Sequence, residues 1–257
     1  MCELFGVTAG RKVRINELLK TFYSHSSEHS NGWGIALLDR EPAFIKKESR
    51  KALNSRCLKK ILKSSIETAG CLAHIRKATI GEVKTANSHP FSGVDASGRR
   101  WVLVHNGTIF DSDHLSPYQY VQEGSTDSER ILLFIVDEAG KLCRRKGGPL
   151  SEDERIRLIE DTILKIVPGN KLDLLISDGE LLYIHKNEAG TLYEKDLEYG
   201  VVFSTRPLDN DAWKEVPGNQ LMVYRNGSTV YAGKKHGHTY VYDEEKMKPL
   251  YLAYSGL

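Results

Sequence analysis

CELFGVTAG, residues 2–10, is the stretch that decides the fold. Its apolar residues and final glycine predict a short buried strand that ends in a turn. The same stretch places Cys2 directly behind Met1, so removal of Met1 would leave a thiol and a free α-amine on one residue. An α-amine titrates at about pH 7.7–8.0 and a thiol at about 8.5, so the amine can take the thiol's proton near neutral pH. This start predicts an N-terminal nucleophile.

Length and charge restrict the possible partners. The chain has 257 residues, which a single hydrophobic core can accommodate, so we expect one domain over residues 1–257. Lys and Arg number 36 against 34 Asp and Glu, a net charge of +2. This balance argues against nucleic acid or an acidic membrane as a partner.

The four cysteines form no C-x-x-C pair and no spacing typical of metal ligands. We therefore expect no metal and a reducing, cytoplasmic setting. No basic and apolar leader precedes Cys2, and no run approaches the ~18 apolar residues that cross a bilayer. His236-Gly237-His238 lacks a further ligand nearby, which favours a solvated loop over a metal site. No glycine motif for a nucleotide is present, so we expect no cofactor.

Hydrophobic periodicity predicts strands, then two long helices, then strands. Residues 15–27 have the spacing of a helix, residues 31–40 and 42–48 that of a hairpin, and residues 53–62 that of a second helix. Strands are expected at 71–79 and 101–110, separated by a glycine-bearing loop at 92–100. The remaining expected elements are two helices at 127–143 and 151–167, followed by a second sheet-forming section with strands near 171, 181, 201, 220 and 228. This order fits an α+β protein better than βαβ units.

His105-Asn106-Gly107 lies in the strand expected at 101–110. Cleavage of an amide by a thiolate needs donors for the oxyanion that develops on the carbonyl. The Asn106 side chain and the Gly107 backbone N–H can supply such donors, and glycine permits a close approach. An ordinary Asn-Gly hairpin turn is the alternative.

Two charged residues are candidates for binding a substrate. Arg76 ends an apolar strand, where its guanidinium can hold a carboxylate with two hydrogen bonds. Asp127 begins the long helix at 127–143 and can bind an ammonium group, although an Asp at this position also simply favours the helix dipole. Neither residue is decisive alone.

Taken together, Cys2, NGWG, HIRKAT, NSHPF, HNG and STDSE follow the order of motifs in a known family. The chain resembles the glutaminase domain of class II glutamine amidotransferases over most of residues 2–130. The resemblance implies that Cys2 attacks the γ-amide of glutamine, that Asn106 and Gly107 form the oxyanion hole, and that Arg76 and Asp127 hold the α-carboxylate and α-amino groups.

The resemblance extends less firmly to neighbouring residues. It implies that Trp33 and Gly34 shape the pocket and that Thr79 and His89 surround the bound glutamine. His89 precedes Pro90, and a structural turn there is the alternative. His74 and His105 fall on apolar strands, where a hydrogen-bonded core histidine is the commoner outcome.

Weaker similarity over residues 177–179 and 204–218 is typical of the small stand-alone branch of the family. The resemblance implies an α+β fold, a four-layer αββα sandwich of the N-terminal nucleophile hydrolase type. It also implies hydrolysis of glutamine to glutamate and ammonia through a thioester. An acceptor-synthase protein is a conceivable partner that would consume the ammonia.

Three alternatives remain open at this point. The substrate can be a γ-glutamyl peptide or conjugate, which predicts a pocket that is open beyond the amide nitrogen. The chain can be a non-catalytic subunit that senses glutamine, as retention of Met1 would favour. The chain can also be a different amidase with an N-terminal Cys, which predicts a pocket without the charged pair Arg76 and Asp127.

Overall fold

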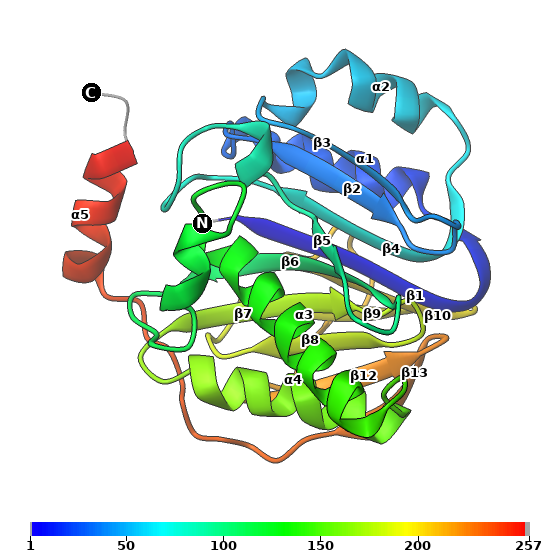
Figure 1. Cartoon of the computed structure of the whole chain (residues 1–257). Coiled ribbons are helices and arrows are strands. Elements are labelled where there is room, and N and C mark those ends of the chain that lie inside the picture. Colours follow the sequence, from blue (N-terminus) through cyan, green and yellow to red (C-terminus); the bar gives the residue numbers. More distant parts are fainter. Residues whose placement is uncertain (1, 255–257) are drawn as a thin grey trace.

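Two stacked antiparallel sheets form the centre of the molecule in the computed structural model, which describes residues 2–254 (Figure 1). The first sheet has the strand order β11-β9-β10-β1-β4-β2-β3 and the second has the order β13-β12-β8-β7-β6-β5. The strands are β1 (Glu3–Arg14), β2 (Trp33–Leu37), β3 (Phe44–Glu48), β4 (Glu67–Ile75), β5 (Phe91–Val94), β6 (Arg100–Thr108), β7 (Lys171–Ser177), β8 (Leu182–Lys186), β9 (Tyr193–Leu197), β10 (Gly200–Ser204), β11 (Lys214–Glu215), β12 (Gln220–Arg225) and β13 (Ser228–Ala232).

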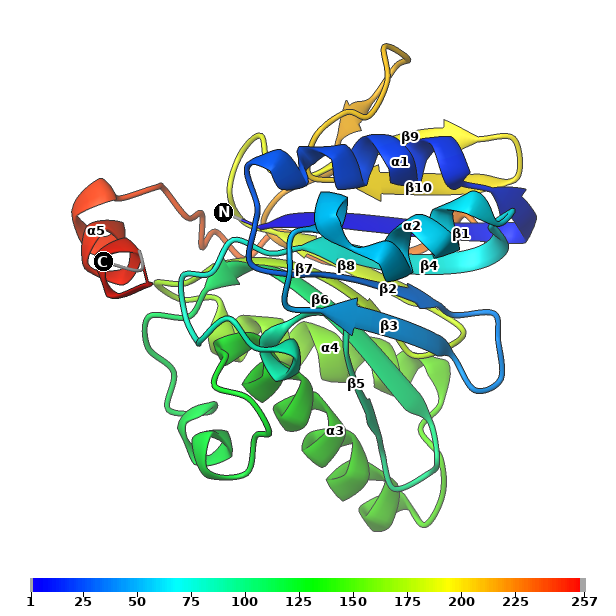
Figure 2. The same cartoon turned by 90° about the horizontal axis from the view of Figure 1, so that it is seen from above.

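Helices cover the outer face of each sheet (Figure 2). They are α1 (Asn16–Ser24), which a 3-10 turn at His25–Ser27 extends, α2 (Arg56–Lys63), α3 (Asp127–Lys146) and α4 (Glu152–Ile166). The C-terminal helix α5 (Glu244–Tyr254) stands at the edge of the molecule and covers neither sheet. Helices α1 and α2 lie on the first sheet, and α3 and α4 lie on the second. The predicted four-layer αββα sandwich is therefore confirmed.

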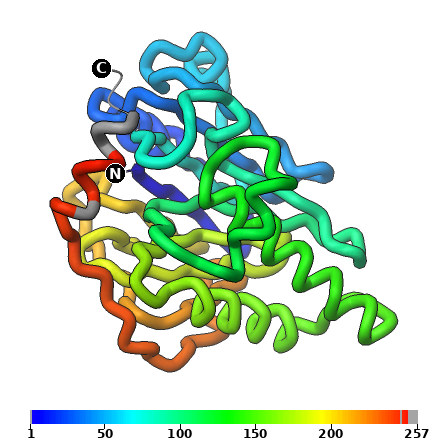
Figure 3. The backbone as a smooth tube through the Cα atoms, turned by 60° about the vertical axis from the view of Figure 1, so that its left-hand side comes forward, coloured from blue at the N-terminus to red at the C-terminus, as the bar shows by residue number. Residues whose placement is uncertain are grey.

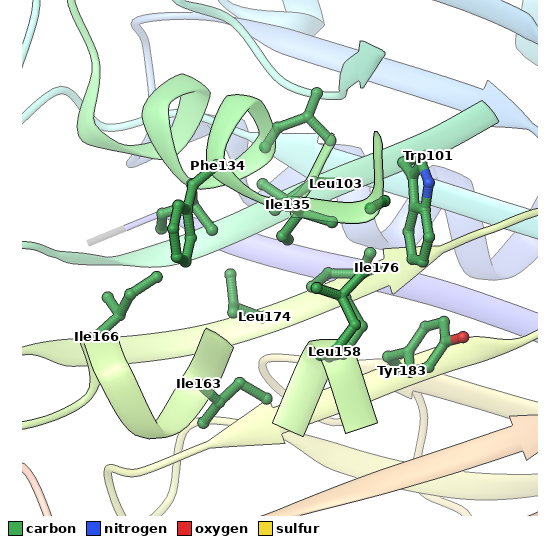
Figure 4. Close-up of a cluster of buried hydrophobic side chains, with 14 of the residues drawn as sticks. Trp101, Leu103, Phe134, Ile135, Leu158, Ile163, Ile166, Leu174, Ile176 and Tyr183 are labelled. Carbon is green, nitrogen blue, oxygen red and sulfur yellow. The ribbon is translucent and has the colours of Figure 1, made fainter. Parts of the chain in front are cut away.

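Three hydrophobic clusters fill the spaces between these layers. One joins α1 and α2 to the first sheet, and another lies between the two sheets around residues such as Leu4 and Val104. The third packs α3 and α4 against the second sheet, with Trp101, Leu103 and Ile135 at its centre (Figure 4). Because side chains alternate along a strand, each sheet contributes residues to two of these clusters.

The opening strand lies inside the first sheet, between β10 and β4. The turn expected at Gly10 does not form, because the Gly10 N–H donates to the carbonyl of Tyr199 at 2.8 Å and the strand continues to Arg14. Its pairing with β4 shifts in register between Thr8 and Val13. The start of β1 places Cys2 on the inner face of its sheet, on the same side as Leu4.

The long helices begin and end as the sequence predicts. Ser151 and Glu154 form a reciprocal capping box at the start of α4. Helix α3 ends at Gly147, whose φ of 74° is the left-handed conformation that favours glycine. The predicted hairpin of β2 and β3 is also confirmed.

Four local expectations differ from the structure. Part of the loop expected at 92–100 is strand β5, which pairs with β6. Leu53 lies before α2 and is 42 % exposed, so it is not part of that helix's buried face. Strands β9 and β10 join the first sheet through β1, whereas the sequence analysis expects a second sheet-forming section. Helix α5 was not expected from the sequence.

None of the helices in the described range 2–254 is long and apolar enough to cross a membrane. The C-terminal segment leaves β13, runs along the second sheet and ends in α5, at the edge of the molecule on the side where β1 begins (Figure 3).

Candidate active site

Cys2 lies at the beginning of β1 and contacts the segment that follows β4. The Lys77 backbone N–H points to Cys2 Sγ at 3.4 Å, and Sγ lies 3.3 Å from the Lys77 carbonyl oxygen. Burial raises the pKa of the Cys2 thiol, and the positive charge of Arg76 partly offsets this effect. The thiol therefore needs a nearby base to ionise at neutral pH.

A small cavity brings Cys2 together with the two predicted oxyanion donors. Asn106 and Gly107, near the end of β6, line it alongside Cys2. Its volume is about 10 Å³, which is roughly the room that one water molecule needs. Its other lining residues are Lys77, Thr79, Thr108, Lys171, Tyr240 and Met247.

Close packing explains why glycine occupies position 107. A Cβ built on Gly107 would overlap the carbonyl oxygen of Lys171 on β7 and the ring of His105. Asn106 and Gly107 lie within the β6–β7 ladder, opposite Asp173 and Leu172. The Asn-Gly pair is thus part of a strand and not an ordinary hairpin turn, and the ladder holds its position relative to Cys2.

Asp127 is buried at the start of α3, and it is not the residue that caps this helix. Thr126 is the cap, because its side chain accepts a hydrogen bond from the Glu129 N–H. The Asp127 carboxylate accepts from the Ile109 N–H at 2.8 Å and from the Ser128 N–H at 2.9 Å. Its negative charge raises the pKa of the Cys2 thiol, so the two groups lie within electrostatic reach of each other.

Arg76 is buried at the end of β4 and organises the loop that follows. Its guanidinium donates to the carbonyl oxygens of Ile80, Gly81 and Glu82 at 2.8–2.9 Å. The residues of this loop also include Thr79, which lines the Cys2 cavity. A carboxylate that binds to Arg76 must therefore compete with backbone carbonyls of the same loop.

The structure places Trp33 and Gly34 on opposite faces of β2. The Trp33 side chain belongs to the cluster under α1 and α2, and its indole N–H donates to Glu48 at 3.1 Å. The Trp33 side chain thus points away from Gly34, and its part in shaping the pocket stays a prediction. Gly34 faces the other way, where a Cβ would overlap the carbonyl oxygen of His89.

His74 and His89 lie together between the sheets, whereas His105 lies on the other face of β6, beside α3. Burial lowers the pKa of each of these three histidines. His105 meets the expectation for a core histidine, since its Nδ1 lies 2.9 Å from Ser128 Oγ. The His74 Nε2 lies 3.2 Å from the His105 carbonyl oxygen. The ring of His89 stacks on that of His74 at 4.0 Å, and neither of its nitrogens has a hydrogen-bond partner within the described range.

Sequence reasoning missed Lys77, Lys171, Tyr240 and Met247, which line the cavity. Tyr240 and Met247 come from the C-terminal segment, far from Cys2 in sequence, and carry no motif. Lys171 is a buried lysine at the start of β7, where it pairs with Glu188 and lies 3.7 Å from Asp173. A lysine opening an otherwise apolar run was the only local signal.

The described residues include no group of three or more His, Cys, Asp or Glu side chains that is arranged to hold a metal ion. His236 instead contacts His185, with 2.9 Å between their Nε2 atoms. This pair fastens the C-terminal segment to the second sheet.

Comparison with known proteins gives a consistent result for sequence and fold. Residues 1–196 match the family described as "Glutamine amidotransferases class-II". The uncharacterized protein MJ1515 of Methanocaldococcus jannaschii is 29 % identical over 91 % of this chain and 72 % of its own length. The putative glutamine amidotransferase YafJ of Escherichia coli is 24 % identical over 90 % of this chain and its whole length.

One more distant relative has a more specific name, and one solved structure tests the fold. The gamma-glutamyl-hercynylcysteine sulfoxide hydrolase of Mycolicibacterium smegmatis is 24 % identical over 80 % of this chain and 82 % of its own. The crystal structure of a predicted glutamine amidotransferase from Pseudomonas aeruginosa superposes with a TM-score of 0.63 at 19 % identity, over 90 % of this chain and all of that one. The likeness at this identity shows a shared fold.

Proposed function

This chain belongs to the class-II glutamine amidotransferases and resembles their small stand-alone members, and from that premise we propose that it hydrolyses the γ-amide of glutamine through a Cys2 thioester. The observation that carries the proposal is the shared cavity of Cys2, Asn106 and Gly107. It supports a nucleophile placed beside two oxyanion donors. The fold is the α+β, N-terminal nucleophile hydrolase type, and we treat residues 1–257 as one domain.

The first step requires a base for the thiol. Met1 lies outside the described residues, and we propose that it is removed so that Cys2 carries the free α-amine. The amine takes the Sγ proton, directly or through a water, and Sγ forms a bond to the γ-carbon. Because burial raises the pKa of the Cys2 thiol, an attached base matters more here than at an exposed cysteine.

The tetrahedral intermediate then carries negative charge on the former carbonyl oxygen. The Asn106 side-chain amide and the Gly107 N–H donate to this oxygen. When the intermediate collapses, the C–N bond breaks, and the protonated α-amine gives its proton to the departing ammonia. A water molecule then adds to the thioester, and glutamate leaves as Sγ regains a proton.

Recognition of the amino-acid end is assigned to Arg76 and Asp127. The charges of both residues reach Cys2 electrostatically, as expected for groups that flank one short substrate. The α-carboxylate must displace carbonyl oxygens of Ile80, Gly81 or Glu82 from the Arg76 guanidinium. We therefore expect the loop that carries Thr79 to shift when glutamine binds, with His89 presenting its unpaired ring nitrogens from the opposite side.

Hydrolysis of a γ-glutamyl conjugate is the second candidate function, because the relative from Mycolicibacterium smegmatis carries that kind of name. The cavity beside Cys2 favours free glutamine, since a volume of about 10 Å³ leaves no room for a bulky amine. The ammonia then enters water or passes to an acceptor-synthase protein. A glutamine-sensing subunit without turnover would need Met1 to be retained.

Release of ammonia and glutamate from glutamine, measured with protein whose N-terminus is untagged, tests the proposal. Asn106→Ala should lower kcat by about 10²–10³-fold, because one oxyanion donor is lost. The matched control is Asn54→Ala, an exposed asparagine before α2, which should leave kcat unchanged. Equal kcat in wild type and Asn106→Ala, or no turnover in untagged wild type, would reject the proposal.

Substitution of the charged pair separates the family's reaction from that of a different N-terminal Cys amidase. Arg76→Ala and Asp127→Ala should each reduce kcat/KM for glutamine, while an amidase that makes no use of the pair would keep its activity. Circular dichroism and thermal unfolding of each variant identify any loss that comes from the loop and helix contacts of these residues.

A further inference from the structure

The C-terminal segment contributes two side chains, Tyr240 and Met247, to the cavity beside Cys2. These residues stand more than 230 positions from the nucleophile in the sequence. The segment after β13 follows the second sheet and leads to α5, at the edge of the molecule on the side where β1 begins (Figures 1 and 3). One wall of the cavity is therefore made of residues that the family's motifs do not include.

Tyr240 is a fixed part of this wall. Its N–H donates to the Asn187 carbonyl at 2.7 Å, and its ring stacks on Phe110 with 6.2 Å between centroids. The preceding residues are fastened as well, since the Asn187 side chain donates to the His238 carbonyl at 3.1 Å and His236 contacts His185. The strap at 236–240 thus behaves as an extension of the second sheet.

Met247 is held differently. It is 2 % exposed, and among the α5 side chains that the structure describes it is the one that is buried. Val241 and Tyr242, which connect the strap to α5, are 77 % and 44 % exposed. The helix therefore rests on the body through the Met247 side chain, which fits into the cavity beside Cys2.

The position of this wall indicates which part of a substrate it meets. Under the proposed function, Arg76 and Asp127 hold the α-carbon end of glutamine, and neither is among the described residues that line this cavity. An amide carbon at Cys2 Sγ has its oxygen at Asn106 and Gly107 and its α-carbon end directed to Arg76 and Asp127, so its nitrogen takes the remaining direction, toward the wall that Tyr240 and Met247 form. Tyr240 and Met247 therefore face the leaving group.

We propose that Tyr240 and Met247 determine substrate specificity by limiting the leaving group to the size of ammonia. The proposal rests on the proposed function, because the assignment of the two ends of the substrate comes from it. A γ-glutamyl amide with a larger amine has no room for that amine while Tyr240 and Met247 line so small a cavity. Shortening Met247 enlarges the cavity without touching Cys2, Asn106 or Gly107.

The test compares three substrates: glutamine, γ-glutamyl-methylamide and γ-glutamyl-p-nitroanilide. Wild type should prefer glutamine over the anilide by at least about 100-fold in kcat/KM, and Met247→Ala should reduce this ratio by at least about tenfold. Tyr240→Ala should act in the same direction. Exposed neighbours supply the matched controls, Val241→Ala and Lys248→Ala, which should keep the wild-type ratio.

Alkylation of Cys2 gives a second measurement that does not require turnover. Iodoacetamide is small, whereas N-(1-pyrenyl)maleimide is bulky, and intact mass reports the rate for each at Cys2. Met247→Ala should raise the bulky reagent's rate by about tenfold or more and change the iodoacetamide rate much less.

The outcomes separate the two proposals. An unchanged ratio of substrates and of alkylation rates in Met247→Ala would overturn the role of the wall, and so would a wild type that cleaves the anilide as fast as glutamine. If no substrate is cleaved but Met247→Ala removes the size selectivity of alkylation, the role of Met247 in limiting access is supported and the glutaminase assignment fails.

Discussion

The two ends of the sandwich differ in how well their buried polar groups are hydrogen-bonded. Strand β7 runs from Lys171, beside the Cys2 cavity, to Ser177, which precedes Asp178 at the far end. Asp178 is buried, and both oxygens of its carboxylate accept hydrogen bonds. The donors are Arg155 Nε at 2.6 Å, Tyr183 Oη at 2.7 Å and two backbone N–H groups.

At the Cys2 end, buried polar atoms lack such contacts. Within the described residues, both ring nitrogens of His89, the Nδ1 of His74 and the Oδ2 of Asp173 have no hydrogen-bond partner. A buried polar atom without a partner costs about 1–3 kcal/mol. The carboxylate of Asp178 is thus fully hydrogen-bonded at one end, while the end that carries Cys2 keeps buried polar atoms without hydrogen bonds, at a cost in stability.

The largest expected effect comes from the nucleophile. Cys2→Ala should reduce glutamine hydrolysis by at least about 10³-fold, because no other group can form the thioester. Its free energy of unfolding should stay within about 0.5 kcal/mol of wild type, as for a substitution at a partly buried site with few contacts. Ammonia release and urea unfolding measure the two quantities. A large loss of stability in Cys2→Ala would contradict the difference between the two ends.

Asp178→Asn should show the reverse pattern. It leaves the buried Arg155 with Glu180, which is 57 % exposed, as its remaining ionic partner, and removal of one partner from a buried ion pair costs about 3–5 kcal/mol. Urea unfolding measures this loss, and kcat per folded molecule should remain within about twofold of wild type. The control is Asp196→Asn, an exposed carboxylate on β9, which should leave stability unchanged. A selective loss of kcat in Asp178→Asn would contradict the comparison.

Gly34→Ala should change both stability and glutamine hydrolysis, because Gly34 packs directly against the His89 backbone. The added Cβ overlaps the His89 carbonyl oxygen, so the backbone must move, at a cost of about 1–3 kcal/mol. The displacement of His89 should also raise KM for glutamine. Gly148→Ala is a matched control, since a Cβ there meets no atom of the described structure within 4 Å. Equal KM values for glutamine in Gly34→Ala and Gly148→Ala would show that His89 does not contribute to substrate binding.

The smallest effect should be a gain in stability at the Cys2 end. Burial raises the pKa of Asp173 to about 6, above its value of about 3.9 in an unfolded chain. The folded state therefore binds the proton more tightly, so stability falls as pH rises from about 4 to 6. Lys171 keeps Glu188 as its partner when Asp173 is replaced. The free energy of unfolding of Asp173→Asn should therefore exceed that of wild type by about 1–2 kcal/mol at pH 7.5 and equal it at pH 3.5. Urea unfolding at both pH values measures this, and a loss at pH 7.5 would contradict the sign.

Local sequence patterns were sufficient to predict most elements of this fold. The two long helices expected at 127–143 and 151–167 follow from short-range patterns, and both are confirmed, as α3 and α4. Local patterns do not determine which distant strands pair, so the position of β10 beside β1 was not predicted. Helix α5 was missed because Pro249 interrupts its sequence and a helix near a chain end has little periodicity to read.

The candidate site shows the same limit. Cys2, Asn106 and Gly107 were predicted from motifs, and the structure places them around one cavity. Trp33 and Gly34 were predicted as a pair, yet neighbours in a strand point to opposite faces, so only Gly34 faces His89. Tyr240 and Met247 were not predictable, since a side chain that fills space carries no sequence signature.

The measurement that tests the central claim most directly is the intact mass of untagged protein before and after 6-diazo-5-oxo-L-norleucine, a reactive mimic of glutamine. The account predicts a mass without Met1 and a single adduct on Cys2, with none on Cys2→Ala. Peptide mapping distinguishes Cys2 from Cys57, the other partly exposed thiol. Retained Met1 with no adduct would contradict the claim that Cys2 is an N-terminal nucleophile for glutamine.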